Sequence, residues 1–129
     1  MNFTETWLDK TIKEEADIEG FHTYRCDRTS EISRGGVAIY LYDKIETGQL
    51  WEKRYNKCEM VGIEIKELHT INLVVYRPPD TKREEFKVIL ESLKNILNKI
   101  DNQNNTIILS GDFTFRFVEW NRNQCCLLI

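Results

Sequence analysis

The stretch that decides the fold is Thr106-Ile107-Ile108-Leu109-Ser110-Gly111-Asp112-Phe113-Thr114. Residues 106–110 have the largely apolar character of a strand that is buried on both faces. A strand that ends in Gly111-Asp112 lifts a carboxylate to the carboxyl edge of its sheet, and in open α/β folds ligands bind at that edge. The stretch therefore predicts an α/β fold with Asp112 at a functional edge.

A second apolar run lies upstream, at residues 71–76. Pro78 and Pro79 follow it and predict its end, because proline cannot donate to a sheet ladder. The segment between the two runs has the apolar spacing of an amphipathic helix. Strand, helix and strand in this order predict two neighbouring strands joined by a crossover. Tyr76 and Asp112 would then leave the sheet at the same edge.

Periodicity and turn residues predict the remaining elements. Thr81 and Glu84 predict a capping box at the start of the helix over 81–100. A shorter amphipathic helix is expected over 7–19, ending at Gly20. Alternation and turn formers predict strands at 21–25, 37–42 and 60–66, the last of which forms a hairpin with residues 71–76.

Five motifs follow one another along the chain: Glu5-Thr6-Trp7-Leu8, Arg25-Cys26-Asp27-Arg28, Gly35-Gly36-Val37-Ala38-Ile39-Tyr40, Val75-Tyr76-Arg77-Pro78-Pro79 and Gly111-Asp112-Phe113-Thr114. In this order they resemble the endonuclease/exonuclease/phosphatase superfamily, above all the endonuclease domain of non-LTR retrotransposon reverse transcriptase proteins. The resemblance implies an α/β fold, a partial four-layer α/β sandwich of two mixed sheets flanked by helices. Residues 1–120 would belong to this domain, and residues 121–129 would form a short tail outside it.

The resemblance also implies a Mg²⁺-dependent (or Mn²⁺-dependent) phosphodiesterase that nicks DNA. Glu5 corresponds to the metal ligand of the family, and Asp112 to the residue that activates the nucleophile. Tyr76 and Thr114 correspond to positions that face the phosphate. The family usually carries Asn where this chain has Thr114, and a threonine hydroxyl has a shorter reach than an amide.

Each of these residues also has a structural interpretation. Asp112 could cap the turn that follows it, and Glu5 could be an acid at a helix N-terminus. Tyr76 could be a core residue. Arg25 and Asp27 could form an ion pair that holds their loop, as readily as they could contact a substrate.

Other residues with chemical potential are expected to be structural. His22 and His69 lie outside the context of the family's catalytic histidine, and we expect them at the surface. The tryptophans Trp7, Trp51 and Trp120 could stack on bases, but burial is the more common fate of an aromatic side chain.

Composition sets broad limits on the function. The 129 residues carry a net charge of −3, so the chain as a whole has no basic footprint for nucleic acid. None of the four cysteines forms a CxxC pair, and the start of the sequence carries no secretory signal, which predicts reduced thiols in an intracellular protein, nuclear or cytoplasmic and not secreted. No apolar run approaches the length that crosses a membrane, so no membrane association is expected.

Comparison with the superfamily pattern predicts a truncated domain. The opening strand of the family, which carries an asparagine, would precede Glu5, and we expect it to be missing. The C-terminal half, which supplies further aspartates and a histidine, would also be missing. We therefore expect weak or no activity and a large exposed apolar sheet face. The alternatives are a non-catalytic module that binds a protein partner or itself through that face, and a phosphatase of small phosphoesters.

Overall fold

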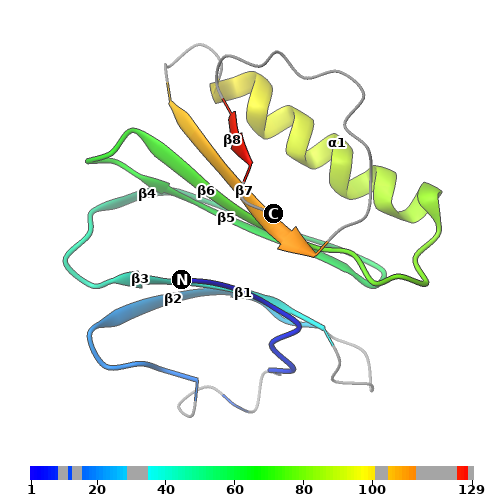
Figure 1. Ribbon diagram of the computed structural model, residues 1–129, viewed down its shortest axis with the longest axis horizontal. Coiled ribbons are helices and arrows are strands. Elements are labelled where there is room, and N and C mark those ends of the chain that lie inside the picture. Colours follow the sequence, from blue (N-terminus) through cyan, green and yellow to red (C-terminus); the bar gives the residue numbers. More distant parts are fainter. Residues whose placement is uncertain (9–11, 13–15, 29–34, 101–104, 113–124, 128–129) are drawn as a thin grey trace.

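The computed structural model describes residues 1–8, 12, 16–28, 35–100, 105–112 and 125–127. Within these ranges the chain is a mixed α/β protein with two sheets and one helix (Figure 1). The elements are β1 (Asn2–Thr4), β2 (Phe21–Cys26), β3 (Val37–Tyr42), β4 (Thr47–Tyr55), β5 (Cys58–Ile65), β6 (Thr70–Tyr76), α1 (Arg83–Ile100), β7 (Thr106–Asp112) and β8 (Cys125–Leu127).

The elements are arranged in layers (Figure 1). Helix α1 covers one face of the five-stranded sheet, whose order is β4-β5-β6-β7-β8, and the three-stranded sheet β1-β3-β2 lies on the other side. The larger sheet is mixed, because β4, β5 and β6 are antiparallel neighbours whereas β6, β7 and β8 are parallel. In the smaller sheet both pairings of the described strands are antiparallel, so the expectation of two mixed sheets is wrong there. Strands β2 and β3 are joined by a connection too short for the crossover that parallel pairing needs.

The crossover β6–α1–β7 has the predicted form. Strand β6 pairs with β7 in parallel, in a register that sets Ile71 opposite Ile107 and Tyr76 opposite Asp112. The hairpin of β5 and β6 is also confirmed. All seven residues of β6 are buried, as expected for a central strand that is covered on both faces.

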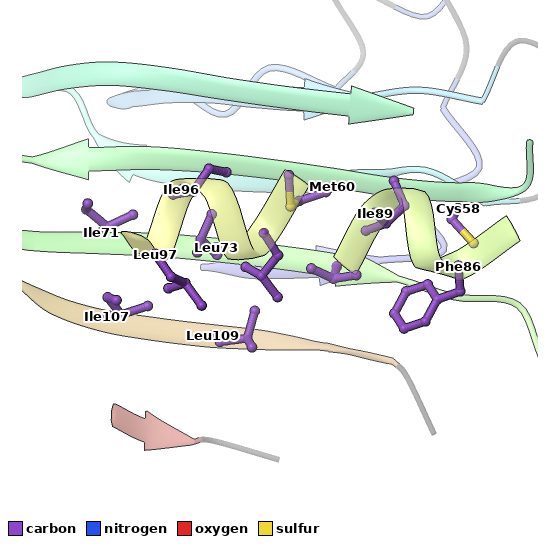
Figure 2. Close-up of a cluster of buried hydrophobic side chains, with 12 residues drawn as sticks. Cys58, Met60, Ile71, Leu73, Phe86, Ile89, Ile96, Leu97, Ile107 and Leu109 are labelled. Carbon is purple, nitrogen blue, oxygen red and sulfur yellow. The ribbon is translucent and has the colours of Figure 1, made fainter. Parts of the chain in front are cut away.

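The core between α1 and the larger sheet is made by alternate residues of the strands and one stripe of the helix (Figure 2). Strand β6 contributes Leu73, which is 0% exposed, and α1 contributes Ile89, also 0% exposed. The buried members of this first core are Cys58, Met60, Ile71, Leu73, Val75, Phe86, Ile89, Leu93, Ile96, Leu97, Ile107 and Leu109.

A second core lies between the two sheets. It is formed by the side chains that alternate with those of the first core, so that Val74 and Tyr76 of β6 point away from the helix. The predicted alternation of β5 is confirmed, since the inward side chains at its odd positions belong to this cluster. Its buried members are Cys26, Val37, Ile39, Leu41, Val61, Ile63, Ile65, Val74 and Tyr76.

Among the described side chains, each core contains one free cysteine. Cys58 lies in the core beneath the helix, and Cys26 lies in the core between the sheets. Burial raises the pKa of the Cys26 thiol to about 12 and also raises the pKa of Cys58. Both thiols are therefore protonated and shielded at neutral pH, in agreement with the prediction of reduced thiols for these two positions.

The predicted helix over 7–19 is wrong where the structure describes it. Residues 7, 8, 12 and 16–20 are not helical, and Trp7 has a φ of 56°, outside the right-handed helical region. Its backbone N–H donates to Gly35 O at 2.9 Å, so a long-range contact replaces the local helical bond. Residues 9–11 and 13–15 lie outside the described residues.

The predicted capping box is also wrong. Helix α1 begins at Arg83, two residues after Thr81. The Thr81 hydroxyl is buried and makes no hydrogen bond to the first turn of the helix, while the Thr81 backbone N–H donates to Pro78 O at 3.1 Å. The turn that follows the two prolines therefore takes the place of the cap.

Three of the described strands were not predicted: β1, β4 and β8, the last of which lies in the segment 121–129 that was expected to be a tail outside the domain. Strand β1 precedes Glu5, where no strand was expected, and pairs with β3. Strand β4 is an edge strand with a bulge between Thr47 and Leu50. Its charged segment 52–54 hid it from pattern analysis, although charges are a common protection of sheet edges.

The large exposed apolar face expected from the sequence is not found among the described strands. Strands β5 and β6 are buried on both sides, and β7 is less covered than these two, with Ile108 and Ser110 half-buried. The exposed large apolar side chains among the described residues are Met1, Phe3, Trp7, Ile18, Tyr42, Leu50, Tyr55 and Leu68.

The packing beneath α1 leads to a stability prediction. Ile89→Ala removes a fully buried side chain from the first core and should lower the free energy of unfolding by about 2–5 kcal/mol. Leu68→Ala is the matched control, because Leu68 is 66% exposed in the turn between β5 and β6. Urea denaturation followed by circular dichroism measures both. Equal destabilisation by the two variants would contradict the assigned core.

Candidate active site at the carboxyl edge of the larger sheet

The site is built at the place where β6 and β7 end together. Tyr76 is the last residue of β6, and Asp112 is the last residue of β7 and its register partner. The backbone N–H of Arg77 donates to the carbonyl oxygen of Asp112 at 2.9 Å, which ties the two strand ends together. The predicted shared edge is therefore confirmed. Asp112 is exposed there, and Tyr76 is 4% exposed.

Glu5 reaches this edge from the other sheet. It follows β1, and its Oε1 accepts a hydrogen bond from the Tyr76 hydroxyl, 71 residues away in sequence. Three of the four predicted site residues, Glu5, Tyr76 and Asp112, thus lie around one strand end. Thr114, the fourth, lies outside the described residues.

The Tyr76 phenol resists ionisation in this setting. Burial raises the pKa of Tyr76 well above its ordinary value, and the hydrogen bond to Glu5 and the negative charges of Glu5 and Asp112 raise it further. The structural interpretation of Tyr76 as a core residue is therefore correct for its ring, while its hydroxyl faces the carboxylates. At neutral pH the phenol is a permanent hydrogen-bond donor.

The loop that carries Glu5 is attached to the glycine pair Gly35-Gly36. The N–H groups of Thr6 and Trp7 donate to Gly36 O at 3.4 Å and Gly35 O at 2.9 Å. Both glycines have positive φ, and a Cβ atom at Gly36 would lie 2.6 Å from the Thr6 hydroxyl. The pair thus supplies a close backbone approach as well as the turn freedom that the sequence indicated.

On its other side, the glycine pair leaves room for Arg28. A Cβ atom at Gly35 would lie 2.4 Å from the guanidinium carbon of Arg28. The guanidinium lies 5.7 Å from the centre of the Tyr76 ring, and its Nε donates to Glu59 Oε1 at 2.8 Å. Arg28 therefore connects the glycine turn, the Tyr76 ring and strand β5.

Glu59 is the residue that sequence reasoning missed. Its side chain is 0% exposed, and burial raises the pKa of its carboxyl while Arg28 counteracts that shift. The sequence did contain an indication that Glu59 is buried, because Glu59 shares the inward face of β5 with Val61 and Ile63. A carboxylate at a buried position of an amphipathic strand predicts a cationic partner.

The charged segment before the glycines contains a second ion pair. Both Nε and Nη2 of Arg25 donate to the Asp27 carboxylate, with Nη2 at 2.6 Å from Oδ2, and Arg25 Nη1 donates to Ile12 O at 3.0 Å. This agrees with the interpretation that the pair holds its loop. It also ties the chain that follows the Glu5 loop to β2.

A polar cluster links the sheets below the site. The Asn2 amide group donates to Asn72 Oδ1 and Ser110 Oγ, both at 2.8 Å, and accepts from the Asn72 amide group at 2.8 Å. Buried polar groups need such partners, because an unpaired amide costs about 1–3 kcal/mol. The short strand β1 is thereby fixed over β6 and β7.

The remaining candidates divide between surface and core. His22 and His69 are exposed, as predicted. Trp51 packs against the first core, whereas Trp7 is 52% exposed beside the site. Trp120 lies outside the described residues.

Comparison with known proteins adds no assignment, because neither the protein-family models nor the curated proteins contain a match to this chain. Among the described residues, no group of three or more His, Cys, Asp or Glu side chains is arranged to hold a metal ion. Within the same ranges, no helix combines the length and the apolar character that a membrane crossing needs.

The buried ion pair leads to a second stability prediction. Glu59→Gln removes the charge that compensates Arg28 and should lower the free energy of unfolding by about 3–5 kcal/mol. Asp80→Asn is the control, because Asp80 pairs with Lys57 at the exposed surface and its loss should leave stability unchanged. Urea denaturation at neutral pH compares the two. A Glu59→Gln protein as stable as the wild type would show that this pair is not buried.

The hydrogen bond of Tyr76 leads to a prediction for alkaline pH. Because the folded-state pKa lies above the ordinary value of 10.0, the phenol stabilises the fold below that pH, and this contribution is lost as pH rises through the folded-state pKa. Comparing tyrosinate absorbance of wild type and Tyr76→Phe isolates this one group. It should remain protonated at pH 10, and Glu5→Gln should lower its pKa. A Tyr76 phenol that is half ionised near pH 10 would contradict the assignment.

Proposed function

We propose that the edge formed by Glu5, Tyr76 and Asp112 is part of a metal-dependent phosphodiesterase site of the endonuclease/exonuclease/phosphatase type, with DNA as substrate. The observation that carries the proposal is the hydrogen bond between Tyr76 and Glu5 beside Asp112, which joins three separate motifs of that superfamily at one strand end. On this proposal, α1 and the two sheets are three layers of the four-layer sandwich, and strand β8 of the larger sheet extends the domain beyond residues 1–120.

The donor set suits Mg²⁺ or Mn²⁺. Hard divalent cations prefer carboxylate oxygens, and Mg²⁺ is commonly held by one or two carboxylates together with water. Glu5 and Asp112 are both exposed, and the phenol engages Oε1 of Glu5. Glu5 would hold the ion, which would supply charge neutralisation at the phosphate.

The residues of the chain would divide the remaining chemistry between them. Asp112 would accept a proton from the attacking water, whose oxygen forms the new bond to phosphorus as the bond to the leaving oxygen breaks. The leaving oxygen would take a proton from solvent. Tyr76, which stays protonated, would donate to a phosphoryl oxygen as charge develops on it.

The test combines metal binding with nicking of supercoiled plasmid. In keeping with the weak activity expected from the sequence, wild type should nick slowly in Mg²⁺ and not at all in EDTA. Asp112→Asn should lower that slow rate by about a hundredfold or more, since this is the contribution of a general base. Glu5→Gln should weaken the binding of Mn²⁺, measured by electron paramagnetic resonance. This second readout does not depend on the turnover rate of the protein.

The matched control is Glu67→Gln, which removes an exposed acid at the opposite end of β6. It should change neither metal binding nor nicking. A wild-type protein that neither binds Mn²⁺ nor nicks in Mg²⁺ would overturn the proposal. Equal effects of Glu67→Gln and Glu5→Gln would do the same, because the ion would then be held by surface charge in general.

A further inference from the structure

Trp7 is unusually exposed for a tryptophan. Its side chain is 52% exposed, although tryptophan is a highly buried residue on average. It lies two residues after Glu5, the side chain that contacts Tyr76. A half-exposed indole is thus carried by the same loop as Glu5.

The backbone conformation of the segment that carries Trp7 is strained. Glu5 and Trp7 both have left-handed backbone conformations, with φ of 53° and 56°. For residues other than glycine such conformations cost of order 1–3 kcal/mol and persist only where the surroundings impose them. Strain of this kind is concentrated at ligand-binding and catalytic sites, which points from the observed geometry to a function.

The surroundings that impose this conformation are visible on both sides of Trp7. Its own N–H donates to Gly35 O at 2.9 Å, and the preceding Thr6 hydroxyl donates to the same carbonyl at 3.5 Å. Further along the chain, Arg25 holds the carbonyl of Ile12 at 3.0 Å. The indole is therefore carried by an anchored loop and needs little further ordering when a ligand stacks on it.

We propose that Trp7 is a stacking platform for an unpaired base of a nucleic-acid strand that passes the carboxyl edge of the larger sheet. The proposal rests on the proposed function, since the neighbouring Glu5, Tyr76 and Asp112 are taken to engage the phosphodiester backbone. It deepens that function by adding a contact to the bases, because a nucleotide strand offers bases beside its phosphates and a small phosphoester need not. Every base has a π face, so such a platform recognises strand rather than sequence.

Binding of a single-stranded oligonucleotide in EDTA tests the platform without cleavage. Two oligonucleotides of equal length and charge are compared, one with bases and one with abasic positions. Wild type should bind the first more tightly, and Trp7→Ala should weaken that binding about tenfold, the value of one base stacked on an aromatic side chain. Trp7→Ala should leave binding of the abasic strand unchanged, and Trp7→Phe should retain most of the preference.

Tyr42→Ala is the matched control. Tyr42 is also an exposed aromatic residue, at 46%, but it lies at the far end of β3 from the Glu5 loop. Its loss should change neither affinity. Circular dichroism of each variant verifies that the fold is retained.

A variant with Trp51 and Trp120 replaced by Phe leaves Trp7 as the fluorescence reporter, and its emission should be quenched only by the strand that carries bases.

The outcomes separate this proposal from the proposed function. Equal binding of the two strands by wild type, no binding of either, or no effect of Trp7→Ala would overturn the stacking platform, whatever the metal and nicking assays show. A base preference that depends on Trp7 in a protein that neither binds Mn²⁺ nor nicks would support the platform. In that case the proposed phosphodiesterase would fail on its own assay.

Discussion

The burial of β6 on both faces is the constraint on which the rest of the structure depends. Because its side chains alternate, Leu73 enters the core beneath the helix while Val74 enters the core between the sheets. One strand thereby determines which face α1 covers and which face the three-stranded sheet approaches. Its last side chain, Tyr76, extends the same alternation to the candidate site, where it bonds to Glu5.

The apolar patterns allowed much of this architecture to be predicted. The runs that became β6 and β7 are locally unambiguous, and the helical stripe between them requires a crossover, so the meeting of Tyr76 and Asp112 could be deduced. The strand β4 could not, since an edge strand is stabilised by pairing on one side and carries charges that mask its period. Trp7 and its neighbours resembled a short helix, but the bond to Gly35 outweighs weak helical propensity.

The polar interior was the least predictable part. The bonds among Asn2, Asn72 and Ser110 join residues 70 and 108 positions apart, and nothing local in the sequence selects these partners. Local sequence likewise does not select Arg28 as the partner of Glu59, although an acidic residue on a buried strand face indicates that a cationic partner is needed. The sequence pattern therefore indicates which polar groups need a hydrogen-bond or ionic partner, and the fold determines which residue that partner is. For the candidate site this means that Glu5 and Asp112 were found as residues, while the elements that hold them in place were not.

The two buried thiols have a consequence for how the two cores can be observed. Cys58 lies beneath the helix and Cys26 lies between the sheets, each as a protonated group that a thiol reagent reaches only when its own layer opens. The chain thus carries a natural chemical probe in each of its two interfaces. Separation of the helix from the larger sheet and separation of the two sheets are distinct events, and the labelling of these two positions distinguishes them without any foreign group in the protein.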